Sequence, residues 1–91
     1  MKDPFDLFPH LIGLVAGELQ YTGIDEQNIR NSLIDDSEEI KKELVPEIEI
    51  LQENIHIYWK QFANITNIYF ESEEELSNWL KLLIKICREN N

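Results

Sequence analysis

The sequence predicts an all-α fold, a compact bundle of four to five helices with a short extended crossing before the last helix. Apolar residues recur at helical spacing in several segments. Gly and Pro number only three each, which favours helices over a turn-rich sheet protein. With 91 residues the chain suffices for one domain with a modest core, so we take residues 1–91 as a single acidic domain.

The first predicted helix begins near Pro9, whose missing N–H costs nothing in a first turn, and ends in a turn over Gln20–Gly23. Gly13 and Gly17 are expected to permit close approach of another element. The apolar stripe of this helix comprises Phe8, Leu11, Ile12, Val15 and Leu19.

A second helix is predicted from Glu26 to Ile34, with Asp25 as N-cap and Ile29 and Leu33 facing inward. Asp36 or Ser37 is expected to cap a third helix, which Pro46 should kink. The inward stripe of this third helix is predicted to be Ile40, Leu44, Ile48, Leu51 and Ile55.

Residues 55–63 are predicted to be helical, and the β-branched and aromatic run from Asn64 to Phe70 to be an extended crossing. An α+β fold with a hairpin around residues 55–70 stays open as the alternative. Ser72 and Glu75 have the spacing of a capping box, which opens the last helix. The stripe of that helix comprises Leu76, Trp79, Leu80, Leu83 and Cys87.

The charge distribution is strongly acidic. The net charge is -10, and seventeen of the eighteen carboxylates lie in the first 75 residues, among only five basic side chains. This charge argues against direct nucleic-acid binding, because a phosphate backbone must be met by Lys and Arg. It suits a protein that binds a basic protein.

The residues required for catalysis or metal binding are not grouped in the sequence. His10 and His56 each lack a nearby Cys or a second His at helical spacing, so no metal site is predicted. There is no Gly-rich phosphate loop and no paired nucleophile and base, so we expect neither an enzyme nor a cofactor. Cys87 falls on an apolar stripe and is expected to be buried. Without a signal peptide or a membrane span, the cytoplasm is the expected location.

Several segments resemble small helical immunity proteins of bacterial contact-dependent growth inhibition systems, over most of the chain. The family pattern runs from a Pro-Leu-(Ile/Leu)-Gly helix through an acidic loop and a short helix to an acidic junction, then to a Tyr-containing crossing and a Trp-Leu pair. The matching segments are Phe8-Pro9-His10-Leu11-Ile12-Gly13, Ile29-Arg30-Asn31-Ser32-Leu33-Ile34-Asp35-Asp36-Ser37 with Glu38-Glu39, Tyr69, and Trp79-Leu80.

One stretch departs from the family. Where members often carry an aromatic-His-Gln-Asp-aromatic sequence, this chain has Val15-Ala16-Gly17-Glu18-Leu19-Gln20-Tyr21, so nothing known of that stretch is transferred. The resemblance implies a cytoplasmic, non-enzymatic protein that binds the toxic C-terminal domain of a cognate effector, often a nuclease. The alternative is an acidic adaptor or regulatory subunit that binds a basic host protein and has no toxin partner. The oligomeric state stays open.

The partner surface is predicted from excess acids near chain turns and from exposed tyrosines. Tyr21, Tyr58 and Tyr69 are candidate surface anchors, whereas Trp59 and Trp79 are expected in the core. The competing explanation for the acids is a solvated face favoured by helix dipoles. The first-choice surface is Tyr21, Asp25, Glu26, Asp35, Asp36, Glu38 and Glu39. The second choice is Tyr69, Glu71, Glu73 and Glu74.

Overall fold

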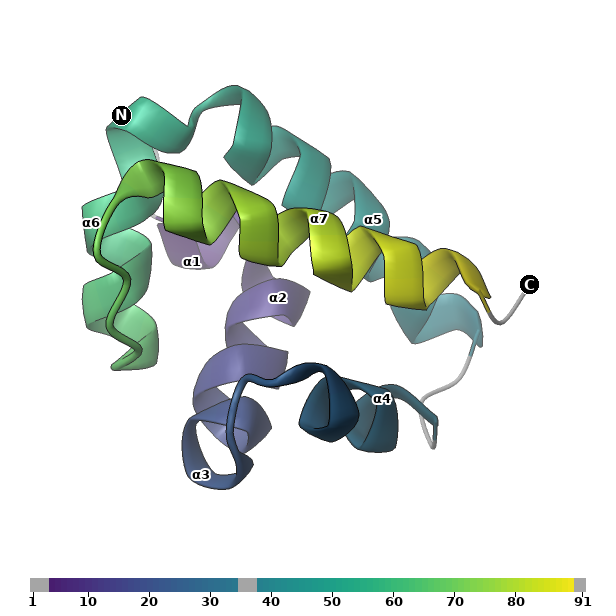
Figure 1. The fold of residues 1–91 in the computed structure, drawn as a ribbon. Helices are drawn as coiled ribbons and strands as arrows, with labels where there is room; N and C mark the ends of the chain where they lie inside the picture. Colours follow the sequence, from purple (N-terminus) through teal and green to yellow (C-terminus); the bar gives the residue numbers. More distant parts are fainter. Residues whose placement is uncertain (1–3, 35–37, 90–91) are drawn as a thin grey trace.

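A computed structural model describes residues 4–34 and 38–89 of the chain, and these are helical with short connections (Figure 1). The prediction of an all-α bundle is confirmed. The described residues contain no strand, so the alternative hairpin around residues 55–70 is wrong. The expected caps Asp36 and Ser37 lie outside the described residues.

The N-terminal segment is more divided than the single predicted helix. It comprises α1 (Pro4–Leu7), α2 (Pro9–Leu14), the π-helical turn η1 (Val15–Leu19) and α3 (Gln20–Thr22). The predicted turn over Gln20–Gly23 is therefore wrong for its first three residues, and the segment ends at Gly23, which has a φ of 119°. All five residues of the predicted stripe are buried.

The close approach expected at two glycines is not found. A Cβ built on Gly13 or Gly17 would meet no heavy atom within 4 Å among the described residues, so that prediction is wrong. Both glycines are exposed, because the apolar stripe turns the opposite side of the segment toward the core.

Helix α4 (Glu26–Ile34) has the predicted bounds. The Asp25 carboxylate accepts a hydrogen bond of 2.9 Å from the N–H of Asn28, which is the bond of an N-cap to the third helical residue. Ile29 and Leu33 are fully buried, as the spacing predicted.

Helix α5 (Glu38–Glu53) runs through Pro46. Leu44, Ile48 and Leu51 are buried as predicted. Ile40 is 41% exposed, so its assignment to the core is wrong. The Ile40 side chain lines a hollow of about 320 Å³ beside α2. The first turns of α5 do not pack closely enough against α2 to cover this side chain. Ile55 is half-buried and belongs to the next helix.

Helix α6 (Ile55–Thr66) is longer than predicted. It ends in a Schellman motif, in which Asn67 adopts the left-handed conformation and the N–H groups of Asn67 and Ile68 donate to the carbonyls of Asn64 and Ala63. The crossing therefore follows Asn67, and the prediction that it starts at Asn64 is wrong. Packing outweighs the intrinsic β propensity of Ile65 and Thr66. In the helix, Ile65 packs against the core cluster and Thr66 is fully buried.

Helix α7 (Glu73–Glu89) opens with the predicted cap. The Ser72 hydroxyl accepts from the N–H of Glu75 at 3.2 Å, while the Glu75 carboxylate accepts from the N–H of Glu71 at 3.1 Å. The second bond differs from a standard capping box, in which the N-cap N–H is the donor. Ile86 joins the predicted stripe, all of which is buried, including Cys87.

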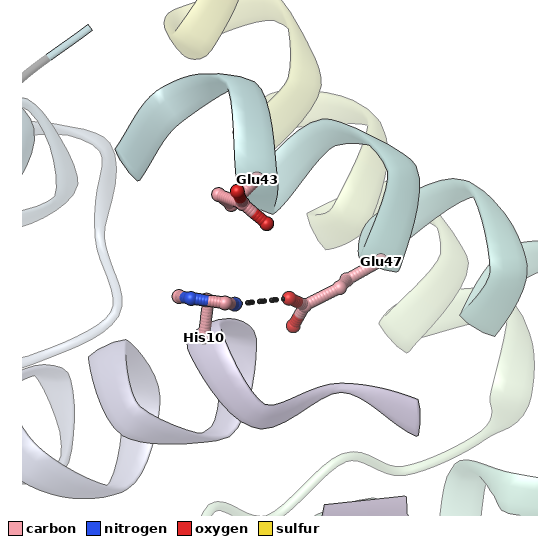
Figure 2. A group of neighbouring side chains, drawn as sticks. All are labelled: His10, Glu43 and Glu47. Atoms are coloured by element: carbon pink, nitrogen blue, oxygen red, sulfur yellow. Dashed lines mark hydrogen bonds and ion pairs between the residues drawn. The ribbon is translucent and has the colours of Figure 1, made fainter. Parts of the chain in front are cut away.

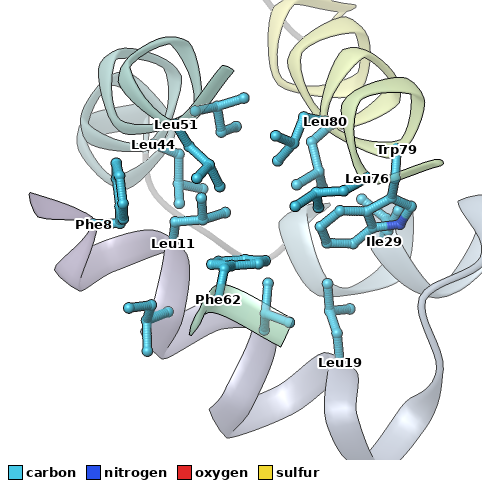
Figure 3. Packing of buried hydrophobic residues seen from close by; sticks show 14 of the residues in the cluster. Phe8, Leu11, Leu19, Ile29, Leu44, Leu51, Phe62, Leu76, Trp79 and Leu80 are labelled. Atoms are coloured by element: carbon cyan, nitrogen blue, oxygen red, sulfur yellow. The ribbon is translucent and has the colours of Figure 1, made fainter. Parts of the chain in front are cut away.

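The core lies between α2, α5, α6 and α7, with α4 packed on the underside of α7 (Figures 1 and 3). Trp79 is buried and donates its indole N–H to the carbonyl of Ile24 at 2.9 Å. Tyr58 is only 7% exposed and meets the Phe8 ring edge to face, so its role as a surface anchor is wrong. No helix within the described residues combines the length and apolar composition needed to cross a membrane.

Candidate partner-binding surface

The acids at the start of α4 take part in the fold. Asp25 caps the helix, and the Glu26 carboxylate accepts a hydrogen bond of 3.2 Å from the Arg30 guanidinium. Arg30 also donates to Glu89 and so links α4 to the end of α7. That bond lowers the pKa of Glu89, so the pair adds stability above the ordinary glutamate range and loses it as the pH falls.

The first-choice surface divides into two parts. Asp35 and Asp36 lie outside the described residues. Helix α4 has nine residues, so its ends are about 12 Å apart at 1.5 Å per residue. Asp25 and Glu26 lie at its beginning and Tyr21 lies in the preceding α3, whereas Glu38 and the exposed Glu39 open α5, which follows its other end. The described members therefore do not form one compact cluster.

The second-choice residues lie beside a hollow. Tyr69 is 79% exposed and lines a hollow of about 420 Å³ between α6 and the crossing to α7. Trp59, Lys60 and Phe70 share its wall, and the Lys60 ammonium lies 5.6 Å from the centre of the Trp59 ring. Glu71, Glu73 and Glu74 follow directly along the chain, and Glu73 pairs with His56 at 2.7 Å. We call Trp59, Tyr69, Glu71 and Glu74 the Tyr69 surface.

Trp59, predicted in the core, is half-buried and packs against the core cluster from its edge, whereas Tyr58, predicted at the surface, is buried. Adjacent helical residues point about 100° apart, so Tyr58 and Trp59 cannot both face the core centre. The buried residues of α6 are Tyr58, Phe62 and Thr66, spaced by four. This spacing was available in the sequence, and it leaves Trp59 half-buried at the edge.

A second group of side chains was also missed. His10 lies in the first turn of α2, and its Nδ1 is 2.6 Å from a Glu47 carboxylate oxygen on α5 (Figure 2). The other Glu47 oxygen accepts from the N–H of Leu11 at 2.9 Å. Glu43 points to the same place, one turn earlier on α5 (Figure 2). More than thirty residues separate His10 from these acids, so no local spacing could indicate the group.

The Tyr69 surface offers exposed aromatic area and a hollow, and carboxylates follow it along the chain. Such amphipathic aromatics are common among residues that dominate binding energy. Comparison of the chain with protein-family models, with curated proteins and with solved structures finds no match, so no relative's function can be transferred to it.

Proposed function

We propose that this chain is an immunity protein, which acts in the cytoplasm by binding the basic toxic domain of a cognate effector and covering its surface. The observation that carries the proposal is the number of carboxylates without a basic partner. Nine acids form no ion pair with any described basic residue, and they add to a net charge of -10. They are Asp6, Glu18, Asp25, Glu39, Glu43, Glu53, Glu71, Glu74 and Glu75.

Uncompensated negative charge favours capture of a basic protein in two ways. It raises the rate of encounter, because opposite charges steer diffusion. It also excludes nucleic acid from a basic nuclease cleft that the acidic protein covers. Specificity then comes from a few anchors, since charge alone does not discriminate between basic partners.

The Tyr69 surface is the proposed site of contact. It combines a hollow, a largely exposed tyrosine and a half-buried tryptophan with two acids that form no ion pair among the described residues. At the start of α4, by contrast, Asp25 and Glu26 are already engaged in a cap and an ion pair. The resemblance to immunity proteins in the sequence supports the toxin partner.

The first experiment is a pull-down with the product of the immediately upstream reading frame, followed by stopped-flow association. The on-rate is expected to fall as salt rises from about 10 mM to about 150 mM, over which the Debye length shrinks from about 30 Å to about 8 Å. An on-rate indifferent to salt would contradict electrostatic capture. Binding to a basic host protein without protection from a toxin would favour the adaptor alternative.

The second experiment compares matched pairs of exposed residues. Tyr69→Ala with Glu71→Lys is expected to cost at least about 2 kcal/mol of binding free energy, as for a hot-spot residue. Tyr21→Ala with Glu39→Lys, which also changes one exposed tyrosine and one exposed acid, should cost much less. If only the second pair abolishes protection in a toxin challenge, the partner binds the first-choice surface instead.

A further inference from the structure

His10, Glu43 and Glu47 form a group with the composition of a metal site. One nitrogen of His10 and one oxygen of each glutamate all lie within 4.8 Å of one another (Figure 2). The two glutamates are four residues apart on α5 and so share one helix face. His10 comes to them from the first turn of α2.

The two carboxylates of this group have no Lys or Arg partner among the described residues. Two carboxylates spaced by four on a helix repel each other. Neither pairs with a Lys or Arg within residues 4–34 and 38–89, and His10 is the only basic side chain paired with Glu47. The Glu47 side chain is only 10% exposed, and a buried charge is costly unless it is compensated. A cation between the three side chains would supply that compensation.

We propose that His10, Glu43 and Glu47 bind one divalent transition-metal ion of the zinc class. A mixed set of imidazole and carboxylate donors suits Zn²⁺, whereas Ca²⁺ and Mg²⁺ take oxygen ligands. Three protein ligands leave a fourth position for water or a partner side chain. The donor atoms lie within 4.8 Å of one another, so the exposed Glu43 and His10 side chains would move inward to reach the usual distances of about 2.0–2.2 Å from an ion.

The surroundings are arranged as metal sites require. The N–H of Leu11 holds one Glu47 oxygen at 2.9 Å and thereby directs the other oxygen toward His10. His10 and Glu43 are exposed, so an ion reaches the group directly from solvent. On binding, the ion replaces the hydrogen bond between His10 and Glu47, and α2 becomes linked to α5 through the metal.

The test is calorimetric titration of the untagged, chelator-treated full chain with Zn²⁺. One ion per chain is expected. Co²⁺ is the spectroscopic probe, and it should give visible absorption bands that Zn²⁺ displaces.

Glu43→Gln is the decisive variant. Glu43 forms no hydrogen bond or ion pair within the described residues, and its loss of charge relieves the repulsion with Glu47, so the metal-free variant should resist urea at least as well as the parent. Its affinity for Zn²⁺ should fall at least about tenfold, the lower end of what even outer-sphere partners contribute. Glu53→Gln, an exposed change on the same helix, is the matched control and should leave the affinity unchanged.

His10→Asn should abolish the Co²⁺ bands, because it removes the nitrogen ligand. The proposal is overturned if no saturable binding is seen up to millimolar Zn²⁺. It is equally overturned if the ion binds Glu43→Gln as tightly as the parent. Either result leaves the proposed toxin binding untouched, since that is measured by a different assay on a different surface.

Discussion

Gly23 holds a backbone conformation that other residues rarely adopt. Its φ of 119° and ψ of 156° lie in a region populated almost only by glycine. A Cβ there would also approach the Asn28 side-chain nitrogen to 2.8 Å, although that amide can move. The end of the α3 segment therefore depends on this residue.

Gly23→Ala is expected to cost about 1–3 kcal/mol of unfolding free energy, because the backbone must be strained or rearranged. Urea denaturation measures the change. Gly17→Ala is the control: a Cβ there meets no heavy atom within 4 Å among the described residues, so it should be neutral or stabilise by up to about 1 kcal/mol. Equal midpoints for the parent and Gly23→Ala would refute the assigned conformation.

Trp79 joins packing and hydrogen bonding in one side chain. It is buried against Phe70 at a centroid distance of 5.7 Å, and its N–H reaches the Ile24 carbonyl. Trp79→Ala should cost about 3–5 kcal/mol. Trp79→Phe keeps most of the volume but leaves that carbonyl without its donor, so a loss of about 1–3 kcal/mol is expected. Near-parental stability of Trp79→Ala in urea would remove Trp79 from the core.

At the scale of elements, a backbone N–H at the N-terminus of α2 finds its hydrogen-bond acceptor on another helix, α5. Phe8 stands at the N-cap and provides no side-chain hydrogen bond, so the Leu11 N–H donates to Glu47 on α5 instead. The two helices are thus joined by a carboxylate that satisfies a helix N-terminus, where anions are favoured.

Glu47→Ala should lower the unfolding free energy of the chelator-treated protein by about 1–3 kcal/mol, because a buried N–H loses its acceptor. Glu47→Gln retains a carbonyl oxygen and should cost less. Glu53→Ala changes an exposed acid on the same helix and should stay within about 0.5 kcal/mol of the parent. A Glu47→Ala midpoint equal to that of Glu53→Ala would exclude the capping role.

At the scale of the whole molecule, the charge of -10 is spread over a chain with a Cα radius of gyration of 12.0 Å. Repulsion among these carboxylates opposes the compact state, and salt screens it. The urea midpoint at neutral pH should therefore rise with NaCl, which is preferred to sulfate because sulfate stabilises proteins by exclusion. A falling midpoint would show that attractive ion pairs, such as those of Arg30, dominate.

The sequence by itself determined the helices whose ends are set by neighbouring residues. Helix α4 has its predicted bounds because the Asp25 carboxylate caps it by accepting a hydrogen bond from the N–H of Asn28, only three residues along the chain. The stripe of α7 is buried as predicted, because the wide apolar face of this long helix tolerates small errors of rotation. Tyr21 and Tyr69 were predicted as surface residues, and both are exposed, although their role in binding stays a prediction.

Only the tertiary structure decided which side chains meet across helices. Ile40 fits the helical stripe yet is exposed, since its burial depends on how closely α2 approaches the start of α5. His10 and Glu47 are 37 residues apart in the sequence and nevertheless lie within 2.6 Å of each other, because α2 and α5 pack together. Helix periodicity and caps act within about four residues, whereas these contacts depend on the packing of the complete core.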